Sequence, residues 1–174
     1  MKRAVGLWQL VGFAVTSLLG TVLHFLYDWV KEAPWAAPIS GVNESTWEHM
    51  KLLFVPMALF ATVEWFFLRE RKDFWCIKLR GILLGLLLIP VIFYTYNGAI
   101  GKSPDWLNIA IFFASAAIVY LYETAKLRRP ESACRRPWLS VLLIALLALF
   151  FVIFTFTPPR LGIFMDPLTG TYGI

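Results

Sequence analysis

Five long apolar stretches dominate this chain and limit what it can fold into. Each is about as long as a helix that crosses the hydrocarbon core of a bilayer, which takes roughly 20 residues. Apolar residues make up 59% of the sequence, more than a soluble domain uses. We therefore predict an all-α, polytopic membrane protein with five transmembrane helices in one domain, residues 1–174, located in the plasma (bacterial inner) membrane as a multi-pass protein. The predicted spans are residues 4–28, 46–68, 77–97, 106–125 and 138–157.

The first apolar stretch follows Lys2 and Arg3, as it would in a signal peptide. It is too long for the apolar region of a signal peptide, and Pro38 disrupts the small-residue pattern that a cleavage site needs. We therefore interpret it as a span. Small or polar residues recur in it at every fourth position, which predicts a face that allows another helix to approach closely. These residues are Gly12, Thr16, Gly20, His24 and Asp28.

The basic residues are distributed unevenly over the two sides that five spans define. Cytoplasmic loops carry an excess of Lys and Arg, so the N-terminus is predicted to be cytoplasmic and the tail, residues 158–174, extracytoplasmic. All eight Trp residues fall near predicted span ends, as in an aromatic belt. Twelve of the 16 basic residues lie on the N-terminal side: Lys2, Arg3, Arg69, Arg71, Lys72, Lys78, Arg80, Lys126, Arg128, Arg129, Arg135 and Arg136.

The segment from His24 to His49 is the strongest candidate for a functional site. It contains both histidines of the chain and joins the first two spans at the predicted outer boundary. His24 and Asp28 are four residues apart and share a helix face, so they could bind a divalent cation together, or Asp28 could orient His24 as a general base. The alternative is a structural hydrogen bond that fixes the end of the helix.

Glu44, Glu48 and His49 add two carboxylates and an imidazole to this segment. Together with His24 and Asp28 they could hold zinc or another divalent metal, with Glu44 as the general base. Two observations favour other roles. Glu48 and His49 are adjacent, so on a helix they point about 100° apart. Ser45 and Glu48 also match a capping box, which gives the Glu48 carboxylate a local partner.

Other polar residues lie near the same predicted boundary. We predict that they bind the head group of a ligand, with interfacial anchoring and an Arg160–Asp166 pair as the alternatives. The tail is apolar enough to fold over the outer mouth as a lid. The candidate ligand-binding residues are Tyr94, Tyr96, Asn97, Arg160 and Asp166.

The remaining polar residues favour structural roles. Glu64 is predicted to pair with a residue of the basic stretch 69–80, the alternative being a proton relay. Cys76 and Cys134 are far apart and lack metal-ligand spacing, which predicts neither a disulfide nor a thiolate metal site. No interleaved aromatic and basic surface indicates nucleic-acid binding.

Several segments carry a resemblance to known proteins. They are 24–28, 42–49, 51–56, 93–96 and 166–174. Over essentially its whole length the chain resembles a family of small bacterial integral membrane proteins of unknown function, which implies a multi-span bundle. It is more distantly similar to the membrane metal-hydrolase superfamily that includes alkaline ceramidases. Those proteins use a zinc site of three histidines with a serine and an aspartate, whereas this chain has two histidines.

Two classes of function therefore stay open. One is a metal-dependent membrane hydrolase that acts on a lipid-like or amide substrate. The other is a non-catalytic protein that binds or transports a small solute or ion, or a structural membrane subunit. The expected partners are the lipid bilayer and a lipid-like or small polar ligand, and the sequence is compatible with a homo-oligomer.

Overall fold

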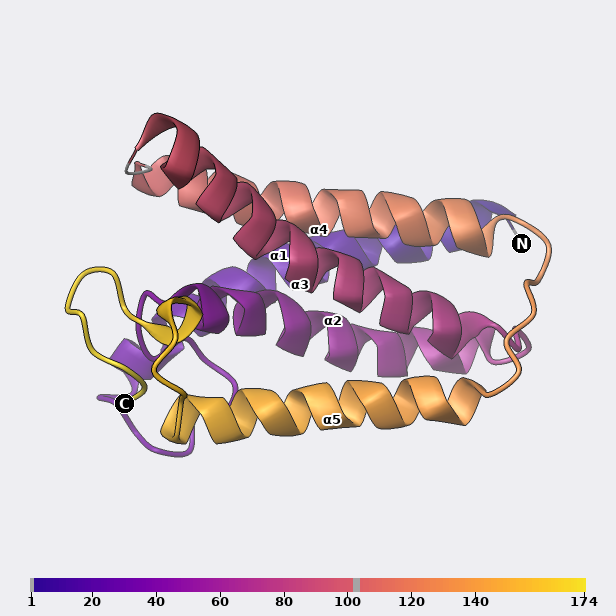
Figure 1. Cartoon of the computed structure of the whole chain (residues 1–174). Coiled ribbons are helices and arrows are strands. Elements are labelled where there is room, and N and C mark those ends of the chain that lie inside the picture. The colour runs from indigo at the N-terminus through magenta and orange to yellow at the C-terminus, as the bar shows by residue number, and fades with distance from the viewer. Residues whose placement is uncertain (1, 102–103) are drawn as a thin grey trace.

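Five α-helices, each long and apolar enough to cross a membrane, make up most of the chain (Figure 1). The computed structural model describes residues 2–101 and 104–174. The predicted all-α class and the prediction of five helices long and apolar enough to span a membrane are confirmed, and they suggest a multi-span membrane protein. The elements are α1 (Lys2–Trp29), α2 (Thr46–Leu68), α3 (Phe74–Ile100), α4 (Asp105–Leu127), α5 (Pro137–Phe156) and the 3₁₀ turn η1 (Gly162–Phe164).

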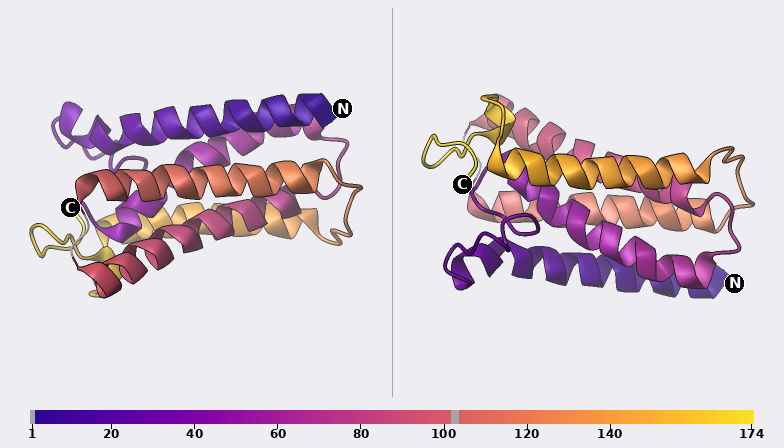
Figure 2. Two further views of the ribbon diagram at one scale, coloured as in Figure 1. Left: turned by 90° about the horizontal axis from the view of Figure 1, so that it is seen from above. Right: turned by 90° about the horizontal axis from the view of Figure 1, so that it is seen from below.

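Helix α2 is the centre of the bundle. It packs against α1, α3, α4, α5 and η1. Helices α1 and α5 lie on opposite flanks, with α5 packed against α3 and α2 (Figure 2). The core between α2, α3, α4 and α5 is filled by aliphatic and aromatic side chains such as Leu53, Ile82, Val119 and Phe151. Many large apolar side chains are exposed on the outer faces, as expected of a bundle surrounded by lipid.

The predicted close-packing face of α1 is directed into the bundle. A Cβ atom at Gly12 would lie 2.5 Å from the Tyr120 ring and 2.6 Å from the Phe60 ring. A Cβ atom at Gly20 would lie 3.0 Å from the carbonyl oxygen of Leu52. Only glycine allows α2 and α4 to approach α1 this closely, so the small residues set the position of α1.

The two ends of the bundle differ in character. The N-terminus, the α2–α3 turn and the α4–α5 loop lie together at one end, which we call the basic end (Figure 1). The α1–α2 loop and the C-terminal tail lie at the other, which we call the tail end. Five antiparallel spans place the two termini at opposite ends and alternate the connecting loops between those ends. The orientation of the two ends in the membrane stays a prediction.

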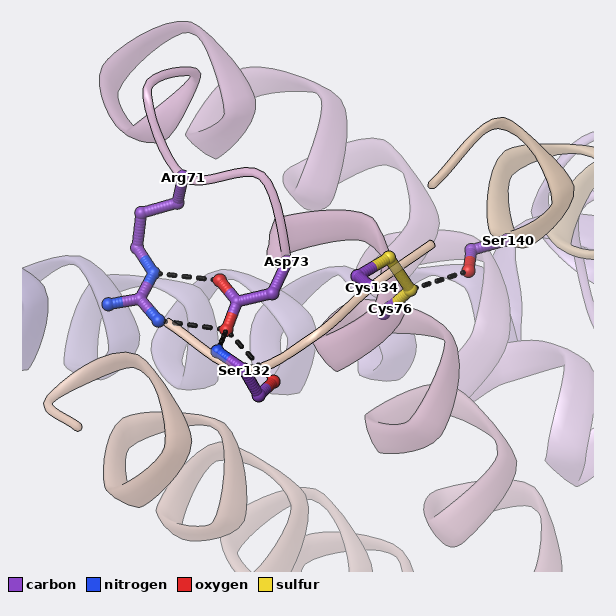
Figure 3. The surroundings of a disulfide bond; sticks show 6 residues. All are labelled: Arg71, Asp73, Cys76, Ser132, Cys134 and Ser140. Carbon is purple, nitrogen blue, oxygen red and sulfur yellow. Dashed lines mark hydrogen bonds and ion pairs between the residues drawn. A yellow bond between two sulfur atoms is a disulfide. The ribbon is translucent and has the colours of Figure 1, made fainter. Parts of the chain in front are cut away.

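The basic end is held together by a charged turn and a disulfide (Figure 3). Arg71 and Asp73 form an ion pair at 3.0 Å, and Asp73 also accepts hydrogen bonds from the N–H and hydroxyl of Ser132 in the α4–α5 loop. Burial alone would raise the pKa of Asp73, but the hydrogen bonds and positive charge of Arg71, together with Ser132, hold this pKa below its ordinary value.

Cys76 and Cys134 are joined in a disulfide with Cα atoms 6.3 Å apart. The prediction that the cysteines are unpaired is therefore wrong. They are 58 residues apart in sequence, but the start of α3 and the α4–α5 loop return to the same end of the bundle. The bond connects the loop that leads into α5 to the start of α3.

The tail folds back onto the tail end of the bundle. Phe164 is buried, with its ring centroid 4.8 Å from that of Trp47 and 5.4 Å from that of Phe154. An isolated β-bridge pairs Met165 with Tyr172, and the Asn43 side chain donates to the carbonyl oxygen of Gly173. The tail is thus an ordered cover attached to α2 and to the α1–α2 loop.

Candidate functional site

His24, Glu44 and His49 come together at the tail end. The Glu44 carboxylate lies 3.8 Å from His24 Nε2 and 3.5 Å from His49 Nε2, one oxygen facing each ring. The ring centroids of the two histidines are 5.6 Å apart. All three side chains are partly exposed, from 26% for His49 to 43% for Glu44, so the group is open to a ligand. We call it the His–Glu–His group.

The α1–α2 loop brings these side chains together. The Gly41 N–H donates to the carbonyl oxygen of Leu23, which returns the loop to the last turns of α1. The Ser45 hydroxyl then accepts the N–H of Glu48 and caps α2, as predicted. Glu44 lies directly before the cap, facing His24 on α1 and His49 in the first turn of α2.

A backbone contact determines which nitrogen of His49 carries its proton. His49 Nδ1 lies 3.0 Å from the carbonyl oxygen of Ser45. A carbonyl oxygen can only accept, so Nδ1 is the protonated nitrogen that donates to it. In the neutral ring, Nε2 then presents a lone pair toward the Glu44 carboxylate, 3.5 Å away.

Two electron-rich groups therefore face one another across this contact. A lone pair beside a carboxylate is unfavourable unless a proton, a cation or a hydrogen-bond donor lies between them. His24 Nε2 stands on the other side of the same carboxylate. The group is therefore suited to a positively charged or hydrogen-donating ligand.

Two adjoining cavities open beside the His–Glu–His group, with volumes of about 270 and 490 Å³. Both are bounded by Glu44 and His49, by Asn108 and Phe112 of α4, and by Leu168 of the tail. The rest of their lining is mostly apolar, from α1 in the larger cavity and from α3 in the smaller. Leu168 places the tail at the mouth of both, which agrees with the expected lid. Further aromatic lining comes from Phe25, Phe93 and Phe113.

Comparison with known proteins places the whole described chain in one family. The model of a family of unknown function, DUF6512, matches residues 2–174. The chain belongs to this family. No curated protein and no solved structure is significantly similar to it. The function of this family is unknown, so a function for the chain has to be inferred from the geometry of the site.

Not all predicted metal ligands join the His–Glu–His group. Asp28 is exposed at the end of α1, while Glu44 takes the place beside His24. Glu48 pairs with Lys51 and accepts hydrogen bonds from Thr155 of α5 and the N–H of Val42. Within residues 2–101 and 104–174, no group of three or more His, Cys, Asp or Glu side chains is arranged to hold a metal ion.

The predicted head-group residues on α3 lie at different distances from the cavities. Asn97 lines the smaller cavity. Tyr94 lies beyond it and connects α2 to the tail, because its hydroxyl accepts from Thr46 at 3.2 Å and donates to the carbonyl oxygen of Gly162. Tyr96 is half-buried on α3 and is not part of the lining of either cavity.

The two predicted residues in the tail have separate roles. Arg160 is exposed. The buried Asp166 carboxylate accepts the N–H of Leu168 at 2.7 Å, and Asp166 also exchanges backbone hydrogen bonds with Thr171 and Gly170. Asp166 therefore shapes the turn that carries Leu168 to the cavities.

Sequence reasoning missed two residues of importance at this end. Asn108 lines both cavities, and its only sequence signal is an amide near the start of an apolar helix. Lys51 is completely buried, with its ammonium 2.5 Å from Glu48 Oε2, 2.7 Å from the Thr155 hydroxyl and 2.8 Å from the carbonyl oxygen of Ala37. Its spacing of three residues from Glu48 was the available signal.

Proposed function

We propose that the protein binds an amphiphilic organic cation, with an amine head group at Glu44 and an apolar tail in the adjoining cavities. The observation that carries the proposal is the arrangement of the His–Glu–His group. One carboxylate faces two imidazole nitrogens, and the fixed proton on His49 Nδ1 directs a lone pair toward it. An ammonium group would supply the missing positive charge and the missing hydrogens.

The walls of the cavities support the same ligand class. The aromatic rings of Phe112 and Phe113 can pack against an alkyl chain, and their faces also attract a cation near the mouth. Small-molecule pockets commonly have volumes of about 300–1,000 Å³, and these two adjoining cavities fall in that range together. Asn97 and Asn108 add amide groups to the mostly apolar lining.

Binding of an alkylamine tests this proposal. We expect dodecylamine to bind once per protein in lipid nanodiscs and to raise the unfolding temperature, whereas dodecanol and laurate, with the same chain but other head groups, do not. Glu44→Gln removes the charge and keeps the shape, so it should weaken amine binding about tenfold to a hundredfold. Native mass spectrometry measures the stoichiometry, and a thermal titration measures the affinity.

Asp28→Asn is the matched control, because it removes a carboxylate that is exposed at the same end of the bundle. This variant should bind dodecylamine as the wild type does. If Glu44→Gln and Asp28→Asn lost the same amount of affinity for dodecylamine, the loss would reflect general surface charge and not a specific site at Glu44. Equal stabilisation by dodecylamine, dodecanol and laurate would mean that the cavities select only for the chain, and the amine proposal would be wrong.

A metal-dependent membrane hydrolase is the second candidate, because a cation between the same three side chains would satisfy the same electrostatic demand. These described side chains are not arranged as a metal site, so a bound metal would have to draw them closer together. His24, Glu44 and His49 would be its three protein ligands, a number that leaves the fourth position of a zinc ion free for water. A zinc ion held there would supply a nucleophilic water for hydrolysis of a lipid-like or amide substrate.

Elemental analysis separates the two candidates. The hydrolase hypothesis expects near-stoichiometric zinc in the wild-type protein after zinc is supplied and excess metal is removed. It expects loss of zinc in His24→Ala and His49→Ala, and retention in Asp28→Asn. Wild-type protein that retains no zinc after zinc is supplied, but still binds dodecylamine, would exclude this candidate and leave the amine proposal intact.

A further inference from the structure

Four helices bring polar side chains together deep in the bundle on the side of the basic end. Glu64 of α2, Lys78 of α3 and Glu123 of α4 meet there, joined by Gln9 of α1. Glu64 and Glu123 are completely buried, and Lys78 and Gln9 are each only 2% exposed. We call these four residues the buried charge cluster. Ionisable groups at such a position are costly and call for a specific explanation.

The contacts within the buried charge cluster are unequal for the two carboxylates. The Lys78 ammonium contacts Oε2 of Glu64 and lies 2.5 Å from Oε2 of Glu123. Glu64 also receives a hydrogen bond from the Gln9 amide on its other oxygen. Glu123 Oε1 has no hydrogen-bond partner and packs against the backbone of α3 at Gly81, where a Cβ atom would collide with it.

The charges of the cluster do not balance. Two carboxylates face one ammonium, which gives a formal excess of one negative charge. Gln9 and Thr16 of α1 are neutral, and so is the Tyr120 hydroxyl of α4, which is hydrogen-bonded to Thr16 at 2.7 Å. A further cation at the end of α4, Arg128, is exposed, lies against Gly6 of α1 and, among the described residues, forms no ion pair with either carboxylate of the cluster. An uncompensated charge buried in this way is strongly unfavourable, so the cluster needs one more positive charge.

The unsatisfied atoms identify what is missing. Gln9 Oε1, Glu64 Oε2 and Glu123 Oε1 are buried without a hydrogen-bond partner, although Glu64 Oε2 does contact the Lys78 ammonium. All three are oxygen acceptors, so the cluster is short of hydrogens rather than of acceptors. The orphaned carbonyl oxygen of Gln9 belongs to a side chain that already donates to Glu64, which makes it an observation independent of the acidic pair.

We infer that the buried charge cluster is a proton-binding site that holds one proton, on the Glu123 carboxyl. Hydrogen bonds and opposite charge favour the ionised form of a carboxyl group. Glu64 accepts a hydrogen bond from Gln9 at one oxygen and contacts the Lys78 ammonium with the other, so it stays ionised, whereas Glu123 contacts only Lys78, with one oxygen. With a proton on Glu123, the cluster contains one ammonium, one carboxylate and one neutral acid, and its charge is zero.

This site is separate from the cavities at the tail end. Gln9, Thr16 and His24 share the inward face of α1, at steps of about 10–12 Å along the helix axis. Such steps are too long for one hydrogen bond to span. The inference therefore does not rest on the proposed amine site, and each can fail without the other.

Infrared spectroscopy tests the inference by detecting the carbonyl stretch of a protonated carboxyl group in the full-length protein in lipid. At neutral pH we expect one such buried group in the wild type. Glu123→Gln should remove the band. Glu64→Gln should also remove it, because Glu123 then ionises as the only partner of Lys78. Lys78→Met should show two protonated groups, because no ammonium is left.

Glu131→Gln is the matched control, since Glu131 is exposed in the α4–α5 loop, and it should leave the band unchanged. Absence of the band in wild-type protein would overturn the inference, and so would a band that persists in both Glu64→Gln and Glu123→Gln. Lys78→Met places two acids side by side and is the variant at risk of misfolding. The two glutamine variants decide the question without it.

Discussion

Replacement of Lys51 by methionine is expected to destabilise the folded protein by about 3–5 kcal/mol, the usual cost of breaking a buried ion pair. The Lys51 side chain is completely buried, and its ammonium contacts the Glu48 carboxylate, the Thr155 hydroxyl and the carbonyl oxygen of Ala37. Methionine fills similar space but leaves the Glu48 carboxylate without its counter-ion. Reversible unfolding by denaturing detergent in mixed micelles measures the loss.

Two variants make this result specific to the pair. The double variant Glu48→Gln with Lys51→Met removes both charges, so it should recover most of the stability lost in the single variant. Lys31→Met removes an exposed lysine from the α1–α2 loop and should change stability by less than about 0.5 kcal/mol. Wild-type stability in Lys51→Met would contradict the buried ion pair.

The Glu48–Lys51 pair also shows where sequence reasoning reaches its limit. The capping role of Ser45 follows from local sequence, and its hydroxyl does accept the Glu48 N–H. In a complete capping box, the Glu48 carboxylate would also accept the N–H of Ser45, but here both groups have other partners. The Ser45 N–H donates to the Asn43 side chain, and the Glu48 carboxylate binds Lys51, because an ammonium is a stronger partner for a carboxylate than a neutral backbone amide.

The five helices were predictable because length and apolarity alone identify a membrane span. The direction in which each polar side chain points could not be predicted in the same way. Along α2 and α3 nearly every face is apolar, so the pattern does not distinguish the inward side from the lipid side. Lys78 therefore counts among the basic residues that predict membrane orientation, although the structure buries it inside the bundle, as it does Lys51.

The His–Glu–His group was only partly predictable for a related reason. His24 and Asp28 share a helix face, and local spacing favours them as a pair. The structure places Glu44 beside His24 because the loop reverses after α1 through Lys31 and Glu32, both with positive φ angles of 55° and 57°. Neither residue is a glycine, so the sequence carries no signal for this reversal.

Removal of the Cys76–Cys134 disulfide is expected to cost about 2–4 kcal/mol, the typical contribution of such a bond, because it restrains the α4–α5 loop against the start of α3. Reductant should lower the stability of wild-type protein to that of Cys76→Ser with Cys134→Ser. The double variant itself should not respond to reductant. Two free thiols in oxidised wild-type protein, with no effect of reductant on unfolding, would contradict the bond.

The same pair of cysteines tests the predicted orientation. The excess of Lys and Arg at the basic end predicts that this end faces the cytoplasm, where thiols are kept reduced. Alkylation of intact cells with a membrane-permeant reagent before lysis should therefore trap Cys76 and Cys134 as thiols, whereas protein purified in air should carry the disulfide. Cysteines protected from alkylation until reductant is added would place the basic end in an oxidising compartment and reverse the predicted orientation. The double serine variant gives the background labelling in both cases.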